Sequence, residues 1–255
     1  MMPFRRGSAH VARLMATATD GARNVTPKAV AIGATEAIAT LREVVLMPLD
    51  LQTALPDVDD SNADVVVFVH GFFASPGVFR PLRERMQKEL DAKVASFTHL
   101  PGVRVDPIAK RLAALVDRIP SHARVHIVGH SLGGLVGRYY VQELGGHARV
   151  TQTISLGSPF GGTKVANALP VLVGADLKTG SELLQRLRAN AHRFDVPHLS
   201  VVADTDRMVI PQNSAMLPWG ETALFRGLGH NGLLYDREVM DLVIARIKKA
   251  QASKS

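Results

Sequence analysis

Hydrophobic residues along the chain follow two alternating patterns. From residue 65 onward, short apolar runs rich in β-branched residues predict strands that are buried on both faces. Longer segments with apolar residues at helical spacing lie between them. Strands are expected at 65–69, 94–97, 125–128, 153–156, 199–203 and 222–225, and helices at 80–89, 107–119, 132–144 and 238–249. This alternation predicts an α/β fold with a mostly parallel central sheet and helices on both faces.

Residues 1–42 precede this alternation and are expected to form an N-terminal helical arm. Thr26 and Pro27 have the pattern of an N-cap followed by proline at the first helical position. Apolar residues then recur at helical spacing to about Arg42, at Val30, Ile38 and Leu41. We expect this helix to pack on the main domain, which spans residues 43–255.

Composition and charge exclude several classes of protein. The 255 residues are 46% hydrophobic and include no cysteine, so disulfides, thiolate nucleophiles and Cys-ligated metals are ruled out. The net charge of +7 lies at the ends, because residues 1–42 and 246–255 carry +4 each and the rest carries −1. A neutral body argues against a nucleic-acid partner and leaves open a peripheral membrane contact through the basic termini.

The N-terminal residues do not have the pattern of a secretory signal. The basic start is followed by His10 and Arg13 rather than by an uninterrupted apolar run. The sequence contains no continuous stretch of roughly 18 to 20 uncharged apolar residues, the length that a membrane-spanning helix needs. We therefore expect a cytoplasmic protein. The composition leaves the oligomeric state undetermined.

The most informative motif is GHSLGG at 129–134, where an apolar strand runs into Gly-x-Ser-x-Gly and then a helix. Gly129 and Gly133, two residues before and after Ser131, allow a sharp strand-to-helix turn, which exposes the hydroxyl at the carboxyl end of the sheet. Serine is a weak nucleophile at neutral pH and needs a histidine base with an orienting acid. The motif therefore makes Ser131 a candidate nucleophile.

Candidates for the base and the acid follow in the chain. His230 lies in a glycine-lined loop after the last expected strand, and two carboxylates, Asp204 and Asp206, follow the strand before it. Both aspartates are candidates for the acid because they share one turn; Asp206, followed by a short apolar pair, is the favoured one. The order Ser131, Asp206, His230 leaves room for an insertion between nucleophile and acid.

Another apolar strand ends at HGF, residues 70–72, on the edge expected to face the nucleophile. Gly71 would let the backbone turn there, and the amide of Phe72 together with that of Leu132 could bind a developing oxyanion. We interpret His70 as structural.

These motifs, together with LGSPFGGT at 156–163 and GHNGLLY at 229–235, resemble the α/β-hydrolase superfamily, and within it the bacterial lipases and esterases. The resemblance covers residues 43–249. It implies carboxylic ester hydrolysis of a small-molecule or lipid substrate through a Ser131–His230–Asp206 triad, with the Phe72 and Leu132 amides as oxyanion hole. No metal or organic cofactor is required. An acyltransferase, a thioesterase or a catalytically silent binding protein of the same fold remain alternatives.

Residues 160–195 are too long for a bare connection. In lipase-like hydrolases a cap over the acyl pocket is inserted at this point, so the resemblance implies a small helical cap here, and an ordinary helix packed on the sheet is the alternative. Ser181 is expected to cap an amphipathic helix within the segment. Three side chains that flank the proposed chemistry are expected to line the acyl site, namely Phe73, Phe160 and Met208.

Overall fold

A single parallel sheet organises the molecule. The computed structural model describes residues 27–46, 48–58, 64–90, 92–168 and 171–252. Within them, six strands pair in the order β2-β1-β3-β4-β5-β6, and each strand is parallel to its neighbours. The strands are β1 (Asp64–Val69), β2 (Ala92–Phe97), β3 (Arg124–His130), β4 (Val150–Leu156), β5 (His198–Ala203) and β6 (Glu221–Phe225). The sequence-predicted strands are all confirmed, with ends shifted by at most three residues.

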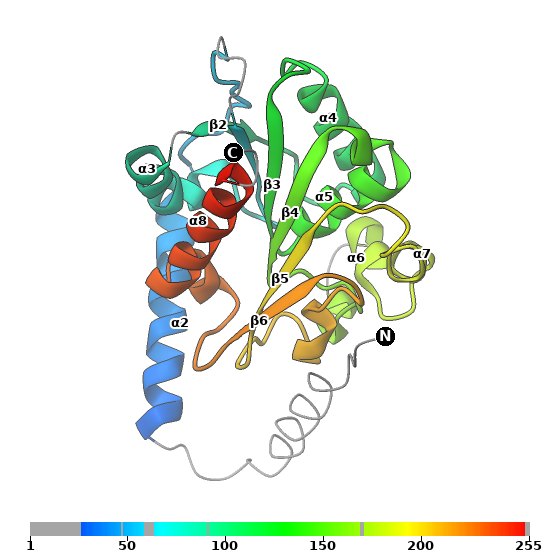
Figure 1. The fold of residues 1–255 in the computed structure, drawn as a ribbon. Coiled ribbons are helices and arrows are strands. Elements are labelled where there is room, and N and C mark those ends of the chain that lie inside the picture. Colours follow the sequence, from blue (N-terminus) through cyan, green and yellow to red (C-terminus); the bar gives the residue numbers. More distant parts are fainter. Residues whose placement is uncertain (1–26, 47, 59–63, 91, 169–170, 253–255) are drawn as a thin grey trace, which may run out of the picture.

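Helices cover both faces of the sheet (Figure 1). One face carries α4 (Val105–Val116), α5 (Leu132–Glu143), α6 (Val171–Leu177) and α7 (Glu182–Ala189), and the other carries α3 (Arg80–Glu89) and α8 (Arg237–Ala252). Short 3-10 helices occur at η1 (Pro76–Phe79), η2 (Gly146–Ala148), η3 (Lys164–Ala168), η4 (Gln212–Ala215) and η5 (Asn231–Leu234).

Alternation along the strands builds two hydrophobic layers. In β1, Val65, Val67 and Val69 belong to the core shared with α4 and α5, whereas Val66 and Phe68 belong to the core shared with α3 and α8. Successive side chains of a strand point to opposite faces, so a continuous apolar run fills both layers. The sheet is therefore a rigid support for the loops at its carboxyl edge.

The expected N-terminal helix is present as α2 (Pro27–Leu46). It begins at the predicted proline and continues past Arg42, through the boundary we expected at 42/43; residues 1–26, with the expected cap Thr26, lie outside the described residues. The helix packs against η1 and η5. Two of the apolar residues that predicted the helix, Ile38 and Leu41, are 55% and 62% exposed, whereas Ala39 is buried. The periodicity of apolar residues predicted the helix, but it did not predict which side of the helix packs against the rest of the protein.

The segment 160–195 forms η3, α6 and α7, apart from residues 169–170, which lie outside the described residues. Ser181 caps α7 as predicted, its hydroxyl accepting a hydrogen bond of 3.3 Å from the Leu184 amide. The apolar side of α7, with Leu183 and Leu187, is buried in the same core as α5. This helix therefore packs on the body through its leucines.

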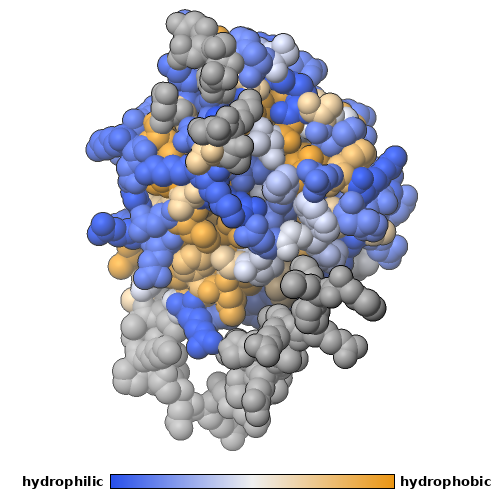
Figure 2. Space-filling model, viewed as in Figure 1, coloured by the Kyte–Doolittle hydropathy of each residue, from blue (hydrophilic) through white to orange (hydrophobic). Residues whose placement is uncertain are grey.

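The molecular surface combines a polar background with separate hydrophobic patches (Figure 2). Large apolar side chains that are exposed include Val44, Val45, Phe73 and Met208. Among the described residues, the structure contains no helix with the length and hydrophobicity needed to cross a membrane.

Candidate active site

Ser131 occupies the sharp turn between β3 and α5. Its backbone has φ 53° and ψ −120°, a positive φ that residues other than glycine rarely adopt. The Ser131 amide donates a hydrogen bond of 2.8 Å to the carbonyl oxygen of Leu156 at the end of β4, which holds the turn in this conformation. Strain of this kind is typical of functional positions.

The glycines of the motif are required by close packing around this turn. A Cβ on Gly129 would lie 2.3 Å from the Gly134 nitrogen, and one on Gly133 would lie 1.9 Å from the carbonyl oxygen of Val69. Neither backbone atom can move without displacing the sheet or α5. The pattern around Ser131 thus has a steric origin in this chain.

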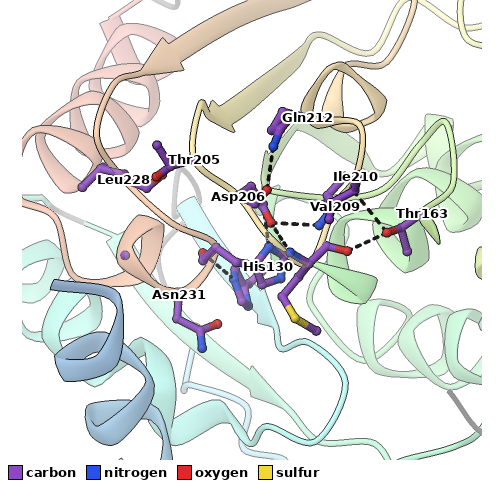
Figure 3. A network of polar contacts seen from close by, with 12 residues as sticks. His130, Thr163, Thr205, Asp206, Val209, Ile210, Gln212, Leu228 and Asn231 are labelled. Atoms are coloured by element: carbon purple, nitrogen blue, oxygen red, sulfur yellow. Dashed lines mark hydrogen bonds and ion pairs between the residues drawn. The ribbon is translucent and has the colours of Figure 1, made fainter. Parts of the chain in front are cut away.

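Asp206 and His230 form a buried pair beside this turn. The Nδ1 atom of His230 donates to Oδ2 of Asp206 over 2.7 Å, and the two residues are 5% and 1% exposed. The other carboxylate oxygen accepts the amides of Met208 and Val209 at 2.7 and 2.8 Å (Figure 3). Gln212 donates from Nε2 to the Asp206 carbonyl oxygen at 2.8 Å. Asp206 is therefore fixed in position by its own turn.

Asp204, the alternative acid, is exposed and turned elsewhere. Its Oδ1 accepts the amide of Gly227 at 2.6 Å, on the connection that follows β6. The structure thus brings Asp206, and not Asp204, against His230.

The electrostatic surroundings of His230 favour its protonated form. Burial alone would lower the pKa of this imidazole, but the hydrogen bond and charge of Asp206, with smaller contributions from Glu36 and Glu43, raise the pKa above its usual value of 6.5. Since Nδ1 donates to Asp206, Nε2 carries the lone pair in the neutral ring. This nitrogen can accept a proton within the pocket that His230 and Ser131 both line.

The proposed oxyanion donors lie on the two sides of Ser131. Leu132 is the first residue of α5, so its amide has no carbonyl partner within the helix. Gly71 approaches so closely that a Cβ there would lie 3.1 Å from Cβ of Ser131, which brings the Phe72 backbone to the pocket. The next residue, Phe73, has φ 56°, which turns the chain away from the sheet.

Two buried histidines support this loop. His70 donates from Nδ1 to the Gly71 carbonyl at 2.9 Å and accepts the His99 amide at Nε2, while its ring stacks on that of His99 at 3.9 Å. Burial, and secondarily the neighbouring His99, lower the pKa of His70 to about 3. His70 is thus neutral at ordinary pH and has the structural place we expected.

His130 lies beneath His230 rather than toward solvent. Its Nε2 donates to the His230 carbonyl at 3.3 Å, and the two rings are 4.7 Å apart. Burial, followed by the neighbouring His230, holds the pKa of His130 well below its usual value. A neutral ring at this position supports His230 without placing a second cation beside it.

A cavity of about 810 Å³ opens above Ser131 and His230. Phe73 and Met208 line it, as expected, and segment 160–195 contributes Thr163, Val165 and Leu177. The expectation for Phe160 is wrong: its side chain is fully buried in the core and packs edge-on against His198. Phe160 belongs to the core layer that the sheet shares with α4 and α5.

One side of the cavity comes from α2, which sequence reasoning did not predict. The lining residues recur at helical spacing, at Gly33, Glu36, Ala37, Thr40, Leu41, Glu43 and Val44. Their spacing of three and four residues was visible in the sequence, but the mixture of acidic, small and apolar residues resembles no known binding motif. The arm is thus part of the site and not only a support for the body.

Comparison with known proteins places the chain in a family. A family model described as Domain of unknown function (DUF7379) matches residues 25–195. The chain belongs to the DUF7379 family. The DUF7379 match includes α2, Ser131 and both proposed oxyanion donors, while Asp206 and His230 lie beyond it.

Solved structures resemble the DUF7379 chain in fold. The mature form of the Bacillus licheniformis lipase BlEst2 is 16% identical with a TM-score of 0.64, and the match covers 78% of this chain and 97% of the lipase. Aspergillus fumigatus lipase B is 18% identical with a TM-score of 0.62, over 75% of this chain and 54% of that one. An esterase from Thermogutta terrifontis is 16% identical with a TM-score of 0.52, and the match covers 74% of this chain and 91% of the esterase. The chain has the α/β-hydrolase fold, as the motifs predicted.

Proposed function

We propose that the protein is a serine hydrolase that cleaves carboxylic esters. The observation that carries the proposal is the buried Asp206–His230 hydrogen bond, located in the cavity where the strained turn presents Ser131. A nucleophile, a base and an orienting acid supplied by separate loops of one sheet edge are the elements of acyl transfer. The lipases and esterases of similar fold agree with this chemistry.

The reaction proceeds in two steps. Ser131 Oγ attacks the ester carbonyl carbon while His230 Nε2 accepts its proton, and the Phe72 and Leu132 amides donate to the oxyanion. His230 then returns the proton to the alcohol as the carbon–oxygen bond breaks, which leaves an acyl group on Ser131. Water attacks this acyl-enzyme, with His230 again accepting and returning a proton, and the carboxylic acid departs.

The cavity favours an ester with an apolar acyl portion. Leu41 and Val44 of α2 line it together with Phe73 and Met208, and each of these side chains is about half exposed around the opening. A hydrocarbon chain that covers apolar surface at the mouth of a reaction pocket removes this surface from water, which favours binding. We therefore propose small-molecule or lipid esters as the substrate class.

Hydrolysis of p-nitrophenyl butyrate and p-nitrophenyl palmitate tests the proposal. Ser131→Ala and His230→Ala should each lower kcat/KM by roughly three orders of magnitude or more. Ser121→Ala and His122→Ala are matched controls, because both residues are exposed on the turn before β3, remote from the cavity. Unchanged activity in Ser131→Ala would overturn the assignment, as would a folded wild type inert toward both esters.

A further inference from the structure

Helix α2 makes a specific polar contact with the loop that carries His230. The Glu36 carboxylate accepts the Asn231 amide at 2.8 Å through Oε1 and the Gly232 amide at 3.1 Å through Oε2. Thr40, one turn further along α2, accepts a hydrogen bond of 3.2 Å from Nδ2 of Asn231. Two adjacent amides held by one carboxylate form a bidentate contact with a defined geometry.

The backbone at Gly229 is shaped to admit this carboxylate. A Cβ at Gly229 would lie 2.2 Å from Glu36 Oε2 and 2.4 Å from its Cδ, so a larger residue would displace the glutamate. Gly229 itself is buried. Glu36 thus contacts both neighbours of His230 in the chain: it packs against Gly229 and binds the amide of Asn231.

His230 is consequently held from three directions. Asp206 binds the imidazole at Nδ1, His130 binds the main-chain carbonyl, and Glu36 binds the two amides that follow. Asp206 lies on the loop after β5 and His130 is the last residue of β3, both at the carboxyl edge of the sheet, whereas Glu36 belongs to α2 (Figure 1). The DUF7379 match begins at residue 25 and therefore includes this helix.

We propose that Glu36 is a positioning residue for the catalytic base, which fixes the 229–232 loop so that His230 faces Ser131. This inference rests on the proposed function, because it assigns Glu36 a role in the same reaction. An imidazole displaced by about 1 Å loses much of its efficiency as a base, and such displacements can cost about 100-fold in rate.

The charge of Glu36 adds a second effect. The groups that face His230 are Asp206, Glu36, Glu43 and the neutral His130, and Arg207 lines the same cavity. The negative charges of Glu36 and Glu43 contribute to the raised pKa of His230. Removal of the Glu36 charge should therefore lower the pKa of the base.

Three substitutions separate position from charge. Glu36→Gln removes the charge but keeps one oxygen acceptor, Glu36→Asp keeps the charge but is too short to span both amides, and Glu36→Ala removes both. Glu84→Gln, on the exposed side of α3, is the matched control. We expect kcat to fall roughly 10-fold in the Asp and Ala variants. The His230 pKa should fall in the Gln and Ala variants and stay closer to wild type in the Asp variant.

Two readouts keep this inference distinct from the proposed function. NMR titration of the His230 ring and of the Asn231 and Gly232 amides needs no substrate, and the pH dependence of kcat for p-nitrophenyl butyrate reports on the reaction. A kcat equal to wild type in folded Glu36→Asp and Glu36→Ala would overturn the positioning role while Ser131 remained the nucleophile. A His230 pKa equal to wild type in Glu36→Gln and Glu36→Ala would overturn the effect of the charge. Loss of the proposed function would instead appear as an inert wild type.

Discussion

Oδ2 of Asp206 lies 2.7 Å from Nδ1 of His230, although 23 residues separate the two in the chain. The pair is buried, and the second carboxylate oxygen is occupied by the amides of Met208 and Val209. This arrangement fixes which ring nitrogen of His230 carries the proton. It also orients the free nitrogen for proton transfer.

Asp206→Asn should lower kcat by about 10⁴-fold, because an amide at this position cannot stabilise the imidazolium and favours the wrong tautomer. Asp204→Asn, two residues earlier on an exposed turn, should change kcat less than threefold. Steady-state ester hydrolysis by the two variants gives the comparison. Equal losses in both, or a larger loss in Asp204→Asn, would mean that the acid is assigned incorrectly.

The sequence predicted the sheet, the nucleophile turn and the order of the candidate triad, because these depend on local patterns. The choice between Asp204 and Asp206 depends on a three-residue turn whose amides bind one carboxylate, and periodicity carries no information on that. Phe160 follows a strand end at the active edge but points into the core, so proximity in sequence was misleading. The contact of Glu36 with Asn231 joins residues 195 positions apart.

The pH profile should reveal the environment of His230. Catalysis requires the neutral imidazole, so kcat/KM should rise with pH through the raised pKa of His230, with an acidic limb centred above 6.5. Neither His70 nor His130 should contribute a limb near neutrality, because burial lowers both of their pKa values. A limb centred below pH 6 would contradict the predicted balance between burial and the surrounding carboxylates.

Substitution of two glycines should have opposite effects on stability. Gly133→Ala places a Cβ 1.9 Å from a main-chain oxygen of β1, and should cost about 3 kcal/mol of unfolding free energy. Gly33→Ala, in α2, meets nothing within 4 Å and should stabilise by about 1 kcal/mol through helix propensity.

Thermal unfolding measures both effects, with about 2 to 4 °C expected per kcal/mol for a protein of this size. A Gly133→Ala variant as stable as the wild type would show that the turn around Ser131 is less tightly packed than the structure indicates.

Buried histidines should make the fold sensitive to acid. The pKa of His70 is lowered to about 3, and burial also lowers the pKa of His198 well below its usual value. A base whose pKa is lower in the folded state binds its proton first in the unfolded chain, so stability is lost as pH falls from 6.5 toward 3. Each such group contributes at most about 1.4 kcal/mol per pH unit in that window.

Chemical denaturation at pH 7.5, 6.0 and 4.5 tests this dependence. His198→Gln, remote from the cavity, should reduce the slope of the unfolding free energy against pH. An identical slope in the variant would mean that His198 titrates normally in the folded protein.

The measurement that tests the central claim most directly is covalent labelling of Ser131 by a fluorophosphonate, followed by mass spectrometry of the modified peptide. This reagent reacts with an activated serine and makes no demand on the acyl or alcohol portions of a substrate. We predict stoichiometric modification at Ser131 in the wild type, none in Ser131→Ala, and labelling slowed by orders of magnitude in His230→Ala. A folded wild type that stays unmodified, or that is modified at another serine, would contradict the account.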